Sequence, residues 1–225
     1  MLTKNTVRLF LVFVTLCSLN VSCSRKVDPG DQASALIREL MSESQAVGIT
    51  VTVGVKGEIV WSQGFGYADL EQQVPVYPDR TRFRVGNVAK PMTALAVAQL
   101  YEQGLLDLDV PIQRYVQSFP KKEGTITTRL LAGHLGGIRH YQGNENLSYK
   151  RYETVLDGLA IFKDDELLHP PGSKYSYSSY GYNLISGMIE NASGKSYLEY
   201  MDEHVFTALG MNHTEADNIY SIIPD

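Results

Sequence analysis

Cysteine is nearly absent from this sequence, which has only two copies, Cys17 and Cys23. Both lie near the N-terminus, in or beside a segment that we expect to be removed. Disulfide-stabilised scaffolds need several cysteines within the folded part of the chain. That class of protein is therefore excluded, and we expect packing alone to stabilise the folded domain.

Long hydrophobic runs suited to crossing a membrane are also lacking. The apolar run at residues 9–17 follows Lys4 and Arg8. A helix that spans a bilayer takes about 20 apolar residues, so this run is too short to do so comfortably. A basic start followed by a short apolar run is typical of a secretory signal. We expect export to the periplasm or the exterior, with an uncleaved N-terminal anchor as the alternative.

Cys23 follows the tetrapeptide L-N-V-S at residues 19–22, which resembles a loose bacterial lipobox. Two outcomes stay open. Cys23 is lipidated, which would attach an exported lipoprotein to a membrane, or signal peptidase cleaves nearby without lipidation. We assign residues 1–23 to the signal, residues 24–31 to a linker and residues 32–225 to the folded domain.

Positive charge is scarce relative to negative charge. The chain has 20 Lys and Arg against 25 Asp and Glu, a formal net charge of −5. Removal of residues 1–22, which hold Lys4 and Arg8 and no acid, lowers it to −7. Nucleic acids and anionic surfaces select basic proteins, so neither is an expected partner. The composition, 44% hydrophobic and 20% charged, is that of an ordinary globular domain.

The central stretch, residues 83–106, predicts a buried helix. Nearly every residue from 88 to 100 is apolar or small and recurs at helical spacing, which predicts a helix covered on most sides. Gly104 suits the left-handed position that ends a helix. Asn87 and Lys90 then lie on one face at the N-terminal end, where backbone N–H groups are unpaired and the helix dipole is positive.

Simple periodicities predict the elements around this helix. Alternating β-branched residues predict a hairpin with strands over residues 47–55 and 58–61 and a turn at Lys56-Gly57. The other expected elements are an amphipathic helix over residues 32–44, a loop over 74–82, a polar helical insertion over 141–163 and a helix over 184–191.

Four segments, taken in order, resemble the serine β-lactamase and penicillin-binding-protein superfamily. Residues 83–90, F-R-V-G-N-V-A-K, are similar to its F-R-x-[AG]-S-x-[ST]-K pattern. Residues 105–115, 125–137 and 170–182 resemble its later G-x-L-x-L-D-x-P-V, I-T-x-x-x-L-L-x-H-x-S-G and P-G-x-x-x-x-Y-S-N-x-G-Y patterns. The resemblance is strongest to the class C-like branch, which includes D-alanyl carboxypeptidases, esterases and mitochondrial β-lactamase-like proteins.

This resemblance implies an α/β fold, with an antiparallel sheet flanked by helices and a mostly helical second lobe. It also implies a chain that is incomplete at the C-terminus, because the family's late [KH]-[ST]-G strand does not occur. The implied activity is hydrolysis or transfer at β-lactam, peptide or ester bonds, with a small-molecule or peptide acyl substrate. No metal or other cofactor is implied.

Acyl transfer of this kind needs a serine nucleophile, a lysine base and a tyrosine that relays a proton. Lys90, whose pKa we expect the helix N-terminus to depress, matches the lysine, and Tyr177 matches the tyrosine. Ser179 falls where asparagine often sits. Asn87 occupies the nucleophile position, and its delocalised amide nitrogen is not a nucleophile. We expect its side-chain oxygen to cap the helix instead.

His134 invites a metal-binding or general-base role. No second ligand stands at a metal-like spacing, so a histidine at a helix end that holds the adjoining loop is the favoured interpretation. Three hypotheses of function remain open: an inactive or truncated hydrolase-family member, an exported non-catalytic module that binds acyl-peptide or cell-wall ligands, and a recent loss or error at Asn87.

Overall fold

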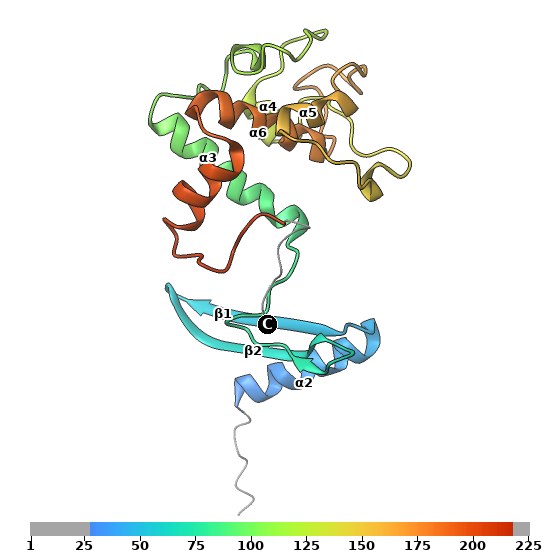
Figure 1. Cartoon of the computed structure of the whole chain (residues 1–225), viewed down its shortest axis with the longest axis vertical. Helices are drawn as coiled ribbons and strands as arrows, with labels where there is room; N and C mark the ends of the chain where they lie inside the picture. The colour runs from blue at the N-terminus through green and yellow to red at the C-terminus, as the bar shows by residue number, and fades with distance from the viewer. Residues whose placement is uncertain (1–27, 218–225) are drawn as a thin grey trace, which may run out of the picture. The chain divides into compact units, whose positions relative to one another are not determined.

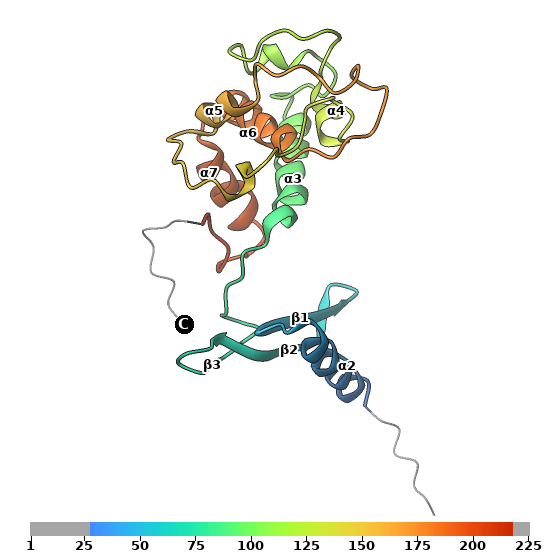
Figure 2. The same cartoon turned by 90° about the vertical axis from the view of Figure 1, so that its right-hand side faces the viewer.

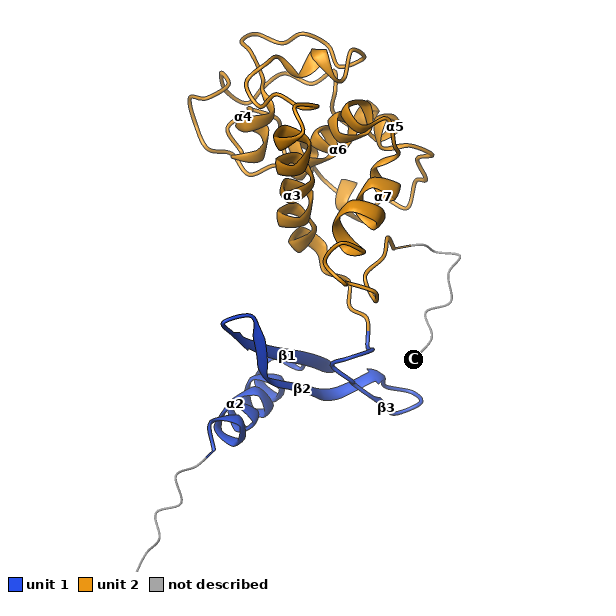
Figure 3. Ribbon diagram, turned by 90° about the vertical axis from the view of Figure 1, so that its left-hand side faces the viewer, with its two compact units in different colours: residues 1–81, 225 blue, residues 82–224 orange. Residues whose placement is uncertain are grey.

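The computed structural model describes residues 28–217, which belong to two compact units. The first unit ends at Thr81 and the second begins at Arg82 (Figure 3). The signal predicted over residues 1–23, with Cys23, lies outside the described residues. Within residues 28–217, no helix is both long and apolar enough to cross a membrane.

The first unit is a small antiparallel sheet with one helix along a face of it (Figures 1 and 2). The strands lie in the order β1-β2-β3, and the helix α2 precedes them in the chain. The bounds are Pro29–Ser44 for α2, Gly48–Val55 for β1, Glu58–Asp69 for β2 and Val74–Pro75 for β3.

The predicted hairpin is confirmed. Lys56 and Gly57 form its turn with φ of 52° and 85°, the left-handed pair whose twist matches two antiparallel strands. The second strand runs farther than predicted, to Asp69. The loop predicted over residues 74–82 was wrong at its start, where β3 pairs with the end of β2. Pro75 is tolerated there because an edge strand can do without one N–H donor.

Helix α2 begins at Pro29, inside the stretch that we assigned to a linker. The carboxylate of Asp28 accepts the N–H of Gly30 at 2.8 Å, and a proline at the first helical position has no N–H to leave unpaired. The predicted apolar face is only partly covered, because Leu36 and Leu40 are exposed.

The second unit is helical and is built around α3, Ala89–Glu102, and α6, Ser179–Ser193, which pack side by side (Figures 1 and 2). Its other helices are α4 at Thr128–Ala132, α5 at Val155–Gly158, α7 at Tyr197–Tyr200 and a π-helical turn, η5, at Met201–Phe206. Four 3₁₀ turns complete its described part: η1 at Gly86–Val88, η2 at Ile112–Arg114, η3 at Glu145–Leu147 and η4 at Leu159–Ile161.

The core of this unit gathers on one side of α3 and around α6. Helix α6 is the most deeply placed element, and four of its side chains are fully buried: Leu184, Ile185, Met188 and Ile189. The helix predicted over residues 184–191 is therefore confirmed, with an earlier start at Ser179.

The predicted central helix is confirmed as α3, and Gly104, at φ 71°, follows its end as expected. The prediction that it is covered on most sides was wrong. Ala96 and Leu100 are fully buried, whereas Leu95 is exposed, so α3 buries one face only. An apolar run of this kind does not show whether a helix is buried on one face or on all faces.

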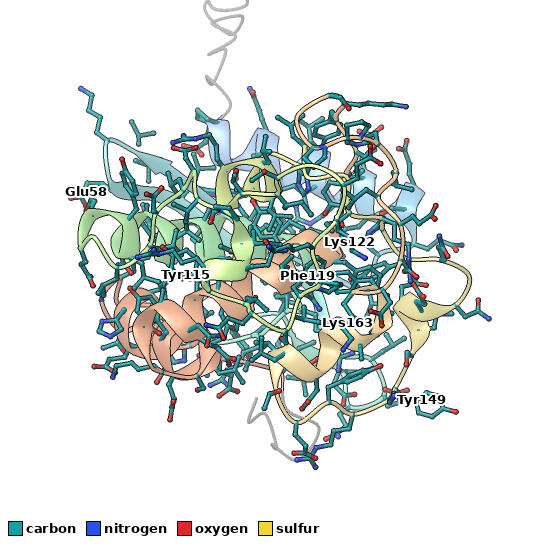
Figure 4. All side chains as sticks on the ribbon, turned by 90° about the horizontal axis from the view of Figure 1, so that it is seen from above. Glu58, Tyr115, Phe119, Lys122, Tyr149 and Lys163 are labelled. Atoms are coloured by element: carbon teal, nitrogen blue, oxygen red, sulfur yellow. The ribbon has the colours of Figure 1, made fainter. Side chains whose placement is uncertain are left out.

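The helical insertion predicted over residues 141–163 is confirmed only in part. The stretch holds three short helical pieces, η3, α5 and η4, and irregular backbone separates η3 from the other two. Tyr149 is fully exposed and stands clear of the other side chains (Figure 4). An ion pair between Arg139 and Glu145 attaches this segment to the residues before it.

Candidate functional site

The site begins at the first turn of α3. Asn87 belongs to the 3₁₀ turn η1, and Lys90 follows one turn later, with its Nζ 2.9 Å from Asn87 Oδ1. The amide oxygen accepts only, so the lysine donates this hydrogen bond. The prediction that the two share a face is confirmed. The predicted cap was wrong, because no side-chain hydrogen bond caps the start of α3.

Lys90 also reaches the start of α6. Its Nζ lies 3.1 Å from the Oγ of Ser179, the first residue of that helix and 89 positions away in the chain. Ser179 is buried, whereas Asn87 is exposed and Lys90 is half-buried. The packing of α3 against α6 therefore brings the lysine and serine positions together.

Two tyrosine rings stand beside the lysine. The Nζ of Lys90 is 5.0 Å from the ring centre of Tyr177 and 5.5 Å from that of Tyr182. At such distances an ammonium is attracted to an aromatic ring. The structure thus places all four predicted site residues, Asn87, Lys90, Tyr177 and Ser179, around one point.

Two histidines hold the segment that carries Tyr177 and Ser179. The Nδ1 of His134 accepts the N–H of Ser178, and the Nδ1 of His140 accepts the N–H of Ser179, both at 3.2 Å. The interpretation of His134 as a residue that holds the adjoining loop agrees with this contact. Sequence reasoning missed His140, and nothing in its sequence surroundings identifies its partner.

The pKa of each histidine lies below its ordinary value. Burial is the main cause of the lowered pKa of His134, followed by the positive charge of Lys90 and the neighbouring His140. Burial and then Lys90 lower the pKa of His140. Both imidazoles are therefore neutral near pH 7, with Nδ1 as the acceptor and the proton on Nε2.

A buried arginine, Arg139, is linked through Glu145 to the start of α6. The side chain of Arg139 is 8% exposed and donates to Glu145 at 2.7 Å and to Asp165. Hydrogen bonding from Arg139 is the largest cause that lowers the pKa of Glu145, to about 2. Tyr180, next to Ser179, donates its hydroxyl to Glu145 at 2.9 Å. Burial, followed by this bond, raises the pKa of Tyr180 to about 12.

The direction of the bond between Lys90 and Asn87 limits the chemistry. A serine hydroxyl would give its proton to the lysine amine. The amide oxygen of Asn87 has no proton to give and can only accept a hydrogen bond. The site is polar and bears one cation, but it offers no nucleophile at position 87. In residues 28–217, no group of three or more His, Cys, Asp or Glu side chains is placed to hold a metal ion.

Comparison with known proteins identifies relatives of the chain. A family model described as beta-lactamase matches residues 33–218. The human mitochondrial serine beta-lactamase-like protein LACTB is 33% identical, over 84% of this chain and 47% of LACTB. An octameric penicillin-binding protein homologue from Pyrococcus abyssi has a TM-score of 0.74 at 29% identity, over 82% of this chain and 44% of that one.

EstCE1, a hydrolase with promiscuous acyltransferase activity, has a TM-score of 0.72 at 26% identity, over 80% of this chain and 51% of that one. The chain thus spans about half the length of these relatives. The predicted α/β fold is confirmed. The chain belongs to the beta-lactamase family, within the superfamily of serine β-lactamases and penicillin-binding proteins.

Proposed function

We propose that this member of a serine-hydrolase family keeps the frame of an acyl-transfer site but forms no acyl-enzyme. One observation carries the proposal: Lys90 donates a hydrogen bond to Asn87 Oδ1 at the position of the nucleophile. Serine catalysis needs the opposite arrangement, in which an O–H gives its proton to the lysine. Loss of the nucleophile from a serine-hydrolase site costs about 10⁶ in rate.

Within residues 28–217, Ser179 has the only hydroxyl that forms a hydrogen bond with Lys90. It does not replace the missing nucleophile in this proposal. Ser179 is 5% exposed, so it is far less accessible to a substrate than the exposed Asn87.

The test is covalent labelling of the full 225-residue chain with a fluorescent penicillin and with a fluorescent fluorophosphonate, followed by a denaturing gel. We expect no band from this chain, while a serine-containing family hydrolase in the next lane is labelled. A band that disappears in Lys90→Ala would overturn the proposal, and its loss in Ser179→Ala would identify Ser179 as the acylated residue.

A second candidate function is a non-catalytic module that binds acyl-peptide or cell-wall ligands. The surroundings of Lys90 favour it. An ammonium has three N–H donors, and within the described part of the chain Asn87 and Ser179 take two. The third can meet a ligand carbonyl or carboxylate beside the faces of Tyr177 and Tyr182.

Calorimetric titration with acetyl-Lys-D-Ala-D-Ala tests this second candidate. We expect saturable binding that Lys90→Met weakens about tenfold or more, as for the loss of one charge-assisted hydrogen bond. Lys121→Met is the matched control, because Lys121 is an exposed lysine of the same unit. Absence of saturable binding, or equal weakening by both variants, would exclude it.

Export is also proposed, and the sequence at residues 1–23 supports it. The name of the human relative LACTB places that protein in mitochondria, so the compartment of a relative does not transfer to this chain. Fractionation of the producing cell tests export directly. Metabolic labelling with a radioactive fatty acid, lost in Cys23→Ala, tests lipidation, and unlabelled parent protein would exclude it.

A further inference from the structure

The start of α6 is held by two imidazoles. The first amides of this helix segment have no partner within the helix and need acceptors from elsewhere. The N–H of Ser178 donates to His134 Nδ1 and the N–H of Ser179 donates to His140 Nδ1, each at 3.2 Å. The N–H of Gly181 donates to the hydroxyl oxygen of Ser178 at 3.0 Å.

Tyr177 lies between the same two rings. Its ring centre is 4.5 Å from that of His134, with the planes tilted by 40°, and 5.3 Å from that of His140, with the planes at 82°. The two histidines therefore touch the segment twice, at its backbone and at its aromatic side chain. The same segment supplies both groups that stand against Lys90 from this side, the ring of Tyr177 and the hydroxyl of Ser179.

The end of α4 places His134 at this contact. His134 takes a left-handed conformation, with φ 59°, two residues after the last residue of α4. This conformation ends the helix, and the N–H of Leu135 donates to the carbonyl of Leu130 at 2.7 Å. The carbonyl of His134 accepts the N–H of Ser176 at 2.8 Å, and its imidazole packs against Tyr175, Tyr177 and Tyr182.

We propose that His134 and His140 are positioning residues: as neutral acceptors they hold Ser178, Ser179 and Tyr177 against Lys90, and protonation of either imidazole releases this segment. The two histidines hold the segment in this way whether the site acylates or only binds a ligand. Neither histidine is assigned a contact with substrate.

Protonation would break the contact for a direct reason. An imidazolium carries a proton on Nδ1, which would then face the N–H that it now accepts. Charged neighbours add to the cost of a positive charge on each ring: Lys90 and His140 act on His134, and Lys90 acts on His140. The aromatic neighbours are uncharged: Tyr175, Tyr177 and Tyr182 at His134, and Tyr141 and Tyr177 at His140.

The sign of the pH effect follows from the lowered pKa of both histidines. Above the ordinary histidine pKa of about 6.5, the rings are neutral in the folded and released forms alike, and the contact is fully present. Below it, the released form takes up protons that the held form does not. The held arrangement therefore loses stability as the pH falls below about 6.5.

The test is heteronuclear NMR of the full chain labelled with ¹⁵N, including the imidazole nitrogens. At pH 7.5 we expect His134 and His140 to show an unprotonated Nδ1 and a protonated Nε2. From pH 7.5 to 5, the amide signals of Ser178 and Ser179 should move together with the ring signals. A protonated Nδ1 at pH 7.5, or amides that do not follow the rings, would overturn the proposal without the use of any variant.

Two substitutions at each histidine sharpen the result. In His134→Asn and His140→Asn, a carboxamide oxygen can stand near the position of Nδ1, so we expect the pH 7.5 amide positions to be kept and their pH dependence to be lost. In His134→Phe and His140→Phe an aromatic ring is kept but the nitrogen acceptor is lost. The amide signals of Ser178 and Ser179 should therefore differ from those of the parent at every pH. His213→Asn, at an exposed histidine, should change neither. Asn variants that keep the parent's pH dependence would overturn the proposal.

Discussion

The ammonium of Lys90 donates a hydrogen bond to the side-chain oxygen of Asn87 at 2.9 Å, one helical turn away. A carboxylate in place of this amide would form an ion pair beside the positive end of α3. We expect Asn87→Asp to raise the free energy of unfolding by about 0.5 kcal/mol at low salt. Urea denaturation measures the gain, which should shrink in about 1 M salt because surface charges are screened.

The lysine supplies the control for this gain. In a Lys90→Met background the ion pair cannot form, so Asn87→Asp should gain less than it does in the parent. An undiminished gain would assign the effect to the helix dipole alone. Asn87→Ser carries no charge, and any change that it causes should not depend on salt.

Arg139 is predicted to be the most important charged residue for the stability of the second unit. Its side chain is 8% exposed and pairs with Glu145 and Asp165, and it donates to the backbone oxygens of His140 and Ile161. Removal of the buried guanidinium leaves two partly exposed carboxylates without their cation and two backbone oxygens without their donor. We expect Arg139→Met to lower the free energy of unfolding by about 3 kcal/mol.

Arg129 offers a matched control for this loss. It also makes a two-bond contact with a carboxylate, that of Asp109, but both side chains are more than half exposed. Arg129→Met should therefore cost much less than Arg139→Met, because an exposed ion pair contributes little to stability. Equal losses from the two substitutions in urea denaturation would contradict the role given to Arg139.

Glu145 makes part of the stability depend on pH. Its pKa is about 2 in the folded chain, chiefly because Arg139 donates to it, against an ordinary value of 4.5. Its contribution is complete above pH 4.5 and is lost as the pH falls toward 2. Urea denaturation between pH 7 and 3 should show a steeper loss in the parent than in Glu145→Gln. Parallel curves would contradict the assignment.

The side chains of α6 set the stability of the helix that carries Ser179. Ile185 is fully buried, whereas Leu198, in α7, is 55% exposed. We expect Ile185→Ala to cost about 2–5 kcal/mol because it leaves a cavity. Leu198→Ala should stay within about 0.5 kcal/mol. Thermal unfolding of both variants checks the difference, and similar midpoints would contradict the observed burial.

Local patterns were enough to predict the main elements of the fold. The alternation at residues 47–61 and the turn at Lys56-Gly57 depend on neighbours in the chain, and the hairpin formed as predicted. The same holds for α3 and α6, whose apolar spacing is a local property. Composition could not tell that α3 buries a single face, because that depends on which elements pack against it.

Only the site residues that lie within the family motifs were predicted from the sequence. Asn87, Lys90, Tyr177 and Ser179 do meet, but the capping role of Asn87 was wrong, because Asn87 lies within η1 and its side-chain oxygen accepts from Lys90. His140 was missed for a different reason. Its bond to the amide of Ser179 joins residues 39 positions apart, and no periodicity records such a contact.

The conformation of residues 141–163 was predicted only in part. Three short helical pieces, η3, α5 and η4, occupy parts of the stretch, and irregular backbone separates η3 from the other two. Their polar composition gave no indication of where each piece begins and ends, nor that Glu145 pairs with a buried arginine.

The central claim is that no covalent acyl intermediate forms at this site. Intact-protein mass spectrometry after incubation of the 225-residue chain with excess benzylpenicillin tests it most directly. We predict an unchanged mass for the parent and for Lys90→Ala. A mass increase equal to the inhibitor, found in the parent, absent from Lys90→Ala and traced by peptide mapping to Asn87, Lys90 or Ser179, would contradict the claim.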